Sequence, residues 1–172
     1  HYQVKGAINL PPAARSPRPK IFVGGKGDRV VSLAGRHADG YNAVWGWTPE
    51  ALDGRFEVLD RAAREHQRDP AGLSRSVGLY VLAGADESEV NERWQRYAAA
   101  TPKGVVDRID RNAWMSDKLA GTYDQIASRI AAFEDIGVEE VILGFGLLPF
   151  QIADPSAVDD LARELIPRLK ES

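Results

Sequence analysis

Residues 19–42 read PKIFVGGKGDRVVSLAGRHADGYN, and they decide the fold because they hold one complete strand–helix–strand unit. Lys20 to Val23 is a compact apolar strand, and the turn GGKG follows it at residues 24–27. Asp28 to Arg36 has the apolar spacing of one amphipathic helix, and a second strand opens near Ala38. This order predicts two parallel strands joined by a right-handed crossover helix.

The same alternation continues to the end of the chain. We predict a helix from Thr48 and Pro49 to about Gln67, a strand at Ser74–Leu82, a helix at Asp86–Ala98, a helix capped by Thr122 and ended by Gly137, a strand within residues 138–146 and a last helix from Pro155 to about Lys170. The last helix is expected to bury Val158, Leu161, Leu165 and Leu169. Strands that alternate with helices indicate an α/β fold with a parallel sheet. Two architectures fit, a small open doubly wound sheet and four consecutive units of a (β/α)₈ barrel.

Composition limits the classes of function. The chain has 172 residues, a net charge of −3, 44% hydrophobic residues and no cysteine. These values fit a single domain, give no general attraction to nucleic acid or to an anionic membrane, and exclude thiol catalysis and thiolate metal sites. No apolar run reaches the length of a membrane span. The absence of cysteine fits a cytoplasmic protein, which is what we expect. Residues 1–19 contain four prolines within INLPPAARSPRP and are expected to form an extended arm ahead of residues 20–172.

The glycine turn at residues 24–27 is the first candidate for a ligand site. In parallel α/β folds, ligands bind beyond the carboxyl ends of strands, where glycine lets backbone amides approach a phosphate. The first 40 residues carry seven Lys and Arg against two Asp and Glu, so this end favours an anion. The turn lacks the GK[ST] ending of a P-loop, and a purely structural turn is the alternative.

Two further segments have open interpretations. Trp45 and Trp47 follow the second strand, where they either wall a planar ring or simply pack. Residues 99–120, with Trp114 and Met115, have little periodicity. We expect this stretch to be a mobile lid or a subunit contact, and the alternative is a packed extra helix.

Three segments resemble the bacterial luciferase-like monooxygenase superfamily, whose members are flavin- or deazaflavin-dependent (β/α)₈ enzymes. Residues 1–42 resemble the extended arm, the glycine-ended fifth strand and the A-D-G-x-N sixth strand of that family. REHQRDPAGLSRS, at residues 64–76, resembles its GRDP turn, with Gln67 in place of the usual glycine. AGTYDQIASRIAAFEDIGVEEVIL, at residues 120–143, resembles its GTPEQV segment, with Tyr123 where proline is common. The chain is therefore similar to strands five to eight, the carboxyl-terminal half of the barrel.

The resemblance implies the positions of a cofactor site. It implies that Gly24, Gly25, Lys26 and Gly27 approach the phosphate of FMN or of the deazaflavin coenzyme F420. Asp39 and Asn42 are expected to end the sixth strand near the same pocket, with residues 144–146 (Gly144 first) at the mouth of the eighth. The family's usual catalytic side chains come from the first four strands, so no catalytic residue is named and no metal is expected.

The resulting hypothesis is half of a flavin- or deazaflavin-dependent oxidoreductase or monooxygenase that transfers hydride to or from a small organic substrate. A non-catalytic half-barrel that binds a phosphorylated ligand or a partner is the alternative, and an unrelated α/β phosphate-binding enzyme is another. Four strands cannot close a barrel, so we expect an exposed inner face with Ile21, Val23, Val81 and Ile142. The expected partner is the missing amino-terminal half or a second copy of the chain. His1 in place of an initiator Met fits a truncated, clipped or mature product.

Overall fold

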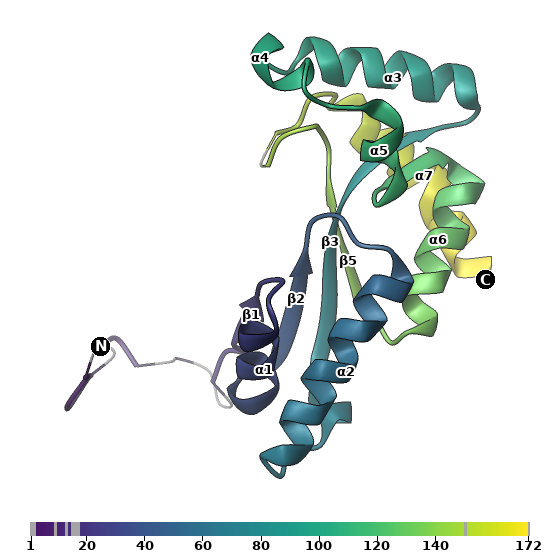
Figure 1. Ribbon diagram of the computed structural model, residues 1–172. Helices are drawn as coiled ribbons and strands as arrows, with labels where there is room; N and C mark the ends of the chain where they lie inside the picture. The colour runs from purple at the N-terminus through teal and green to yellow at the C-terminus, as the bar shows by residue number, and fades with distance from the viewer. Residues whose placement is uncertain (1–2, 9, 13, 15–17, 150, 172) are drawn as a thin grey trace.

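A computed structural model describes residues 3–8, 10–12, 14, 18–149 and 151–171. Its elements in chain order are β1 (Phe22–Gly24), α1 (Asp28–His37), β2 (Gly40–Val44), α2 (Pro49–Glu65), the 3₁₀ turn η1 (Pro70–Gly72), β3 (Ser74–Gly84), α3 (Glu87–Ala99), α4 (Lys103–Val106), α5 (Arg111–Ser116), β4 (Leu119–Thr122), α6 (Tyr123–Asp135), β5 (Glu140–Gly144) and α7 (Ser156–Glu171). The described residues of the first 19 form no helix or strand and extend away from the body (Figure 1).

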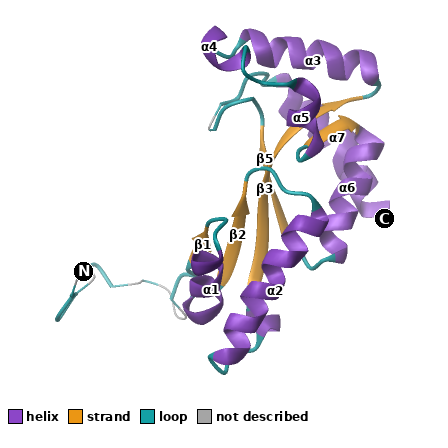
Figure 2. Cartoon of the chain, in the orientation of Figure 1, coloured by secondary structure: helices purple, strands orange, loops and turns teal. Residues whose placement is uncertain are grey.

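All strand pairs are parallel. β1 pairs with β2 and β2 pairs with β3, while β5 pairs with residues 76–80 of β3 and β4 with residues 81–84. The strands therefore run in one direction, and their carboxyl ends lie at one end of the sheet (Figure 2). The parallel α/β class predicted from the alternation is confirmed.

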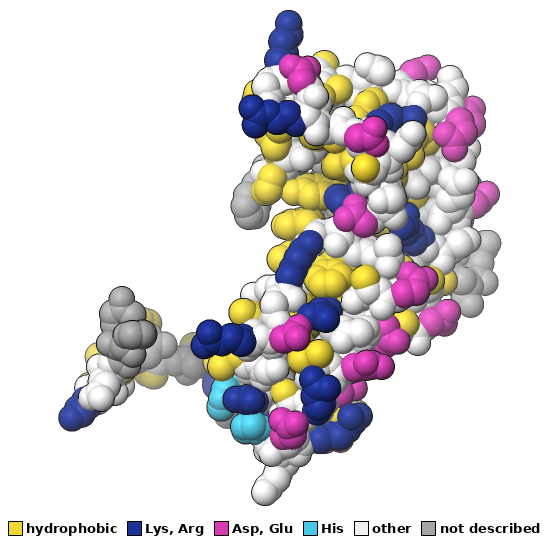
Figure 3. All heavy atoms as spheres, viewed as in Figure 1, with side chains coloured by type: hydrophobic (Ala, Val, Ile, Leu, Met, Phe, Trp, Pro, Cys, Tyr) yellow, Lys and Arg dark blue, Asp and Glu magenta, His cyan; other side chains and the backbone are white. Residues whose placement is uncertain are grey.

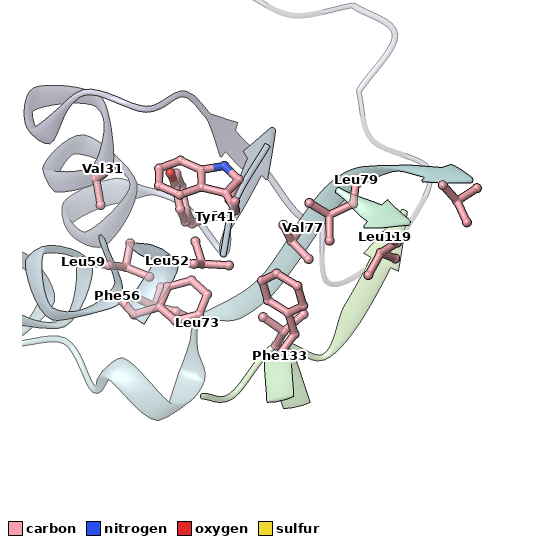
Figure 4. Close-up of a cluster of buried hydrophobic side chains, with 14 of the residues drawn as sticks. Val31, Tyr41, Leu52, Phe56, Leu59, Leu73, Val77, Leu79, Leu119 and Phe133 are labelled. Carbon is pink, nitrogen blue, oxygen red and sulfur yellow. The ribbon is translucent and has the colours of Figure 1, made fainter. Parts of the chain in front are cut away.

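Helices α1, α2, α6 and α7 cover one face of this sheet. Alternate residues of the strands, among them Tyr41 of β2 and Val77 and Leu79 of β3, are buried against side chains such as Phe56 of α2 and Phe133 of α6 (Figure 4). A second cluster lies near the carboxyl ends of the strands, where Leu82 packs with α3 and α5. One hydrophobic cluster therefore packs the helices on the face of the sheet, and the other packs α3 and α5 near the carboxyl ends of the strands.

Local capping signals place the helices where the sequence predicts them. The Thr48 side chain accepts a hydrogen bond from the amide of Ala51 and begins α2. Thr122 and Gln125 form a complete capping box at the start of α6. Both caps depend on residues within one helical turn, which is why the sequence is sufficient to find them.

Several expectations are wrong. The first strand begins at Phe22, and a short extra strand, β4, follows the irregular stretch. Val81 is buried and Val23 faces the helices, because both have the parity of the core-facing residues; of the expected inner residues, Ile142 (40% exposed) and Ile21 are exposed.

The apolar stripe of the last helix is only half buried in α7. Leu161 and Leu165 are buried as predicted, but Val158 is 40% and Leu169 36% exposed. Ile166, on the same helix, is 48% exposed. The structure therefore leaves part of an amphipathic stripe in solvent.

Residues 99–120 are packed. They contain α4 and α5, and Val106, Ile109, Trp114 and Met115 contact the second cluster. The Asp117 carbonyl also accepts a 3.1 Å hydrogen bond from the Trp47 amide. The packed alternative therefore describes the observed conformation, in two short helices rather than one. Over the described residues, no helix is long and apolar enough to cross a membrane.

Candidate functional site

The glycine turn lies at the carboxyl end of β1 and leads directly into α1. Gly25 has φ +154°, and a Cβ there would lie 2.8 Å from Val30 Cγ1, so the fold itself requires glycine at this position. Gly27 differs, because its φ is −80° and a Cβ would meet nothing within 4 Å. The fold therefore leaves open space beside Gly27, which it does not need for its own packing.

Gly27 is also the N-cap of α1. It contributes no side chain to cap the helix, and its carbonyl accepts from the amides of Val30 and Val31. The first amides of a helix carry partial positive charge and lack intrahelical acceptors. The Asp28 carboxylate is paired with Arg55 of α2. The start of α1 therefore presents its first backbone amides beside an open space, with the Asp28 carboxylate held in an ion pair with Arg55.

Lys26 joins this turn to the loop that follows β2. Its Nζ donates to the Trp45 carbonyl at 2.6 Å and to the Gly46 carbonyl at 3.5 Å, and lies 5.1 Å from the centre of the Trp47 ring. These partners are neutral, and within the described part of the chain no carboxylate forms an ion pair with Lys26. The ammonium charge is thus oriented by carbonyls but not neutralised.

Tyr41 holds the turn through a hydrogen bond to its backbone. Its hydroxyl donates to the Gly25 carbonyl, and its ring packs edge-on against Phe56 in the main core. Burial raises the pKa of the Tyr41 hydroxyl, so the group remains a neutral donor at physiological pH. This contact was not predicted from the sequence, since it depends on the close approach of β2 to the turn.

Asp39 does not lie near the turn. It precedes β2, at the amino end of the strand, where its carboxylate accepts from the Ile21 amide at 2.7 Å and pairs with Arg18 at 2.6 Å. The hydrogen bond from Arg18, and then that from Ile21, lowers the pKa of Asp39. The expectation that Asp39 ends the strand at the pocket is wrong, and the residue instead fastens the end of the arm to the sheet.

Asn42 lies inside β2 rather than at its end, in register with Gly24 of β1 and Ser76 of β3. Its Oδ1 atom and the Ser76 Oγ atom are buried without a hydrogen-bond partner in the described structure. Asn42 is therefore next to the strand end that carries the turn, but its side chain makes no contact that assigns it a role.

Gly144 is the last residue of β5, and the Trp45 ring lies beside it. A Cβ on Gly144 would lie 3.2 Å from Trp45 Cζ3, and one on Gly78 would lie 3.3 Å from the same atom. Trp45 also stacks on Tyr80 of β3, with 4.7 Å between ring centres. Of the two tryptophans after β2, Trp47 is buried in the main core, whereas Trp45 lies across the strand ends.

The loop after β2 also meets the start of β4. A Cβ on Gly46 would lie 3.0 Å from Lys118 Nζ, and that ammonium group is paired with Asp117. Lys118 therefore lies close to the carbonyls that hold Lys26, but its charge is neutralised. No group of three or more His, Asp and Glu residues in the described ranges has the arrangement of a metal site.

Comparison with known proteins identifies relatives of this arrangement. The family model described as luciferase-like monooxygenase matches residues 1–140. The FMNH(2)-dependent dimethylsulfone monooxygenase of Pseudomonas putida is 29% identical over an alignment of 187 positions including gaps, which covers 94% of this chain and 49% of that protein.

Solved structures show the same fold. DmoA from Hyphomicrobium sulfonivorans matches with a TM-score of 0.69 and 14% identity, over 99% of this chain and 46% of that one. The coenzyme F420 dependent tetrahydromethanopterin reductase from Methanopyrus kandleri matches with a TM-score of 0.65 and 16% identity, over 87% of this chain and 51% of that one. The chain thus spans about half the length of the relatives it matches.

Proposed function

This chain belongs to the luciferase-like monooxygenase family, and we propose that it is the carboxyl-terminal half of a (β/α)₈ oxidoreductase whose glycine turn binds the phosphate of FMN or F420. The turn meant is residues 24–27, between β1 and α1. In this proposal β1, β2, β3 and β5 are strands five to eight of the barrel, and β4 belongs to the segment between the last two.

The observation that carries the proposal is the unneutralised charge of Lys26 beside an open helix start. Its ammonium group uses two neutral carbonyls as acceptors and retains a third N–H. The space next to Gly27 adjoins the first amides of α1. An anionic phosphate fits such a place, because it accepts hydrogen bonds from amides and from an ammonium group together.

The cofactor, when bound, supplies hydride transfer, and the protein supplies its binding and orientation. In this half, Gly27 and Lys26 hold the anionic end, and Tyr41 keeps the turn rigid through the Gly25 carbonyl. The residues that act on the reacting atoms belong, in this proposal, to the other half. One relative named above uses FMNH(2) and one solved neighbour depends on F420, so both cofactors are tested.

The test uses variants of Gly27 and Lys26. Gly27→Ala places a methyl group in the open space and should weaken FMN or F420 binding about tenfold with little change in stability. Lys26→Gln should weaken it by a similar factor, and the loss should shrink at high salt. Gly25→Val is unsuitable, because the collision with Val30 and the positive φ would damage the fold itself.

Riboflavin and Gly54 provide the controls. Riboflavin lacks the phosphate, so its affinity should be the same in wild type, Gly27→Ala and Lys26→Gln. Gly54 of α2 also has open space around its Cβ position, and Gly54→Ala should leave cofactor binding unchanged. If the affinity for FMN and the affinity for F420 are each the same in both turn variants as in wild type, the turn is only structural. Binding of ribose 5-phosphate as tight as that of FMN would favour the non-catalytic phosphate-binding alternative.

We also propose that the amino-terminal half of the barrel covers the open edges of this chain. Among the described strands, β1 pairs only with β2 and β5 only with β3, so each has one free edge. An apolar groove of about 840 Å³ lies beside β5, between α6 and α7. Its walls include Leu143, Phe145 and the exposed Val158, Ile166 and Leu169.

The lengths of the relatives support an amino-terminal half as the partner. This chain covers 49% of one relative and 46% of one solved structure, so each of them contains about as much chain again. A strand and helix next to β5 would satisfy its edge and fill the groove. Sedimentation and hydrophobic-dye binding test the proposal. The isolated chain should bind dye, and the joined halves should not. A dye-silent, cooperatively unfolding monomer of the 172-residue chain would contradict it, and a stable dimer that buries the groove would assign the surface to a second copy.

A further inference from the structure

Two histidines meet at the surface where α1 and α2 end. His37 is the last residue of α1, and His66 is the C-cap of α2. Their rings lie edge to face, with 6.3 Å between the ring centres and an interplanar angle of 74°. Both side chains are exposed, and Figure 3 shows them side by side in cyan. Because the two residues are far apart in the sequence, it is the packing of α1 on α2 that brings them together.

A hydrogen bond of His66 determines which of its ring nitrogens can bind a ligand. The Nδ1 atom lies 3.2 Å from the Ala62 carbonyl oxygen. Since a carbonyl can only accept, Nδ1 carries the proton, and in the neutral ring Nε2 keeps its lone pair. Histidines that bind metals commonly donate their second N–H to a backbone carbonyl, which fixes the orientation of the ring. The His66 ring is therefore held as the ring of a metal ligand is held.

The separation of the two rings suits one metal ion between them. A Zn–N distance of about 2.0–2.1 Å puts the centre of each ligating ring about 3.2 Å from the metal. Two such rings have centres about 5.3 Å apart at a tetrahedral angle and about 6.5 Å apart in a line through the metal. The observed 6.3 Å lies within this range. Rotation of the two exposed side chains is sufficient to bring the rings to a tetrahedral angle.

The surroundings of the pair select the class of metal. Arg68 donates to the carbonyls of Gly35 and Ala38, so these oxygens at the end of α1 already have a cationic partner. Ca²⁺ and Mg²⁺ require several oxygen ligands, whereas neutral imidazole suits Zn²⁺, Ni²⁺ and Cu²⁺. In the described ranges no third His, Asp or Glu completes a cluster with the pair, so water fills the remaining coordination positions.

We propose that His37 and His66 form a two-histidine site for a divalent transition-metal ion such as Zn²⁺, which links the ends of α1 and α2. The glycine turn precedes α1 at the carboxyl end of the sheet, whereas α1 ends next to the start of β2, at the amino end. The site is therefore separate from the proposed cofactor site. Bound metal stabilises the folded chain, because the unfolded chain does not hold the two imidazoles together.

Titration of the 172-residue chain with ZnCl₂ at neutral pH, followed by calorimetry and by thermal unfolding, tests the site. Wild type should bind one Zn²⁺ per chain and melt at a higher temperature in its presence. His37→Gln and His66→Gln each remove one ligand and should weaken binding at least about tenfold and abolish the thermal shift. Since both side chains are exposed, glutamine at either position should leave the circular dichroism spectrum unchanged.

Two control variants separate the pair from other sites. His1 is the third imidazole of the chain, and His1→Ala should bind Zn²⁺ as wild type does. Lys26→Gln should also bind as wild type does, so the result does not depend on whether the glycine turn holds FMN. Loss of binding in both glutamine variants, with binding retained in the two controls, supports the site. No Zn²⁺ binding in wild type, full binding in either glutamine variant, or its loss in His1→Ala overturns the proposal.

Discussion

Replacement of Gln67 by glycine should stabilise this protein. Among the residues that the structure describes, Gln67 is the non-glycine residue whose φ is positive, at +57°. It directly follows the C-cap of α2. Its amide donates to the Arg64 carbonyl and the Arg68 amide donates to the Ala63 carbonyl, each at 3.0 Å. These two bonds form a Schellman motif, whose left-handed position is usually occupied by glycine.

The magnitude follows from two opposing effects. A left-handed backbone costs an ordinary residue about 1–2 kcal/mol, and glycine avoids that cost. Glycine also makes the unfolded chain more flexible, which lowers the gain by about 0.5–1 kcal/mol. The free energy of unfolding should therefore rise by about 0.5–1 kcal/mol. For a chain of this length, such a change moves the melting temperature by about 1–4 °C.

The chain contains its own reciprocal control at the end of α6. Gly137 has φ +88°, and the amides of Gly137 and Val138 donate to the Glu134 and Phe133 carbonyls in the same pattern. A Cβ at Gly137 would meet Arg75 at an ordinary 3.7 Å, so Gly137→Gln adds backbone cost without a collision. It should destabilise by about the amount that Gln67→Gly stabilises.

Urea unfolding followed by circular dichroism measures all the variants. Gln67→Ala should match wild type, because alanine also carries the left-handed cost. If the slope of the unfolding free energy against urea concentration is unchanged, the unfolded state is comparable among the variants. If Gln67→Gly is no more stable than wild type while Gly137→Gln is destabilised, the left-handed penalty does not govern the α2 terminus and the reasoning fails.

Two further predictions concern α3 and α5. Burial raises the pKa of Tyr97 to about 12, so its contribution to stability is complete below pH 10 and is lost as the pH rises from 10 toward 12. Tyr97→Phe removes the hydrogen bond to the Val81 carbonyl, should cost about 1 kcal/mol at neutral pH and should reduce the alkaline loss of stability; an unchanged alkaline profile in urea unfolding would contradict this. Amides of α5 and of Trp47 should exchange slowly with and without FMN, because the segment is packed; fast exchange that FMN suppresses would restore the lid hypothesis.

The sequence predicts those parts of the fold that depend on neighbouring residues. Thr48 and Thr122 begin their helices as expected, and the glycine turn ends β1, because caps and turns are determined within a few residues. β4 was missed because four residues, LAGT, are too few to show a period. α4 and α5 were missed for the same reason, at four and six residues.

The site depends on contacts between distant segments, and there the sequence is less informative. The glycines after β1 are visible in the sequence, but the carbonyls that orient Lys26 come from the loop after β2. Trp45 and Tyr80 meet only because β2 and β3 are neighbours, and Asp39 lies one residue ahead of β2 rather than at its end. A shift of a few residues in a strand boundary therefore moves a side chain from one end of the sheet to the other.

The exposed stripe of α7 has a different meaning from these errors. The spacing of Val158, Leu161, Leu165 and Leu169 predicts a buried face, and half of it is buried here. Amphipathic periodicity predicts which face of a helix is buried, whereas the structure shows the burial that this chain itself provides. Val158 and Leu169 line the same groove beside β5, the strand with a free edge. In the proposed barrel, the disagreement between pattern and burial coincides with the edge at which the parallel sheet continues. A partner that adds a strand to β5 would bury both residues, and the sequence pattern would then be correct for the assembled protein.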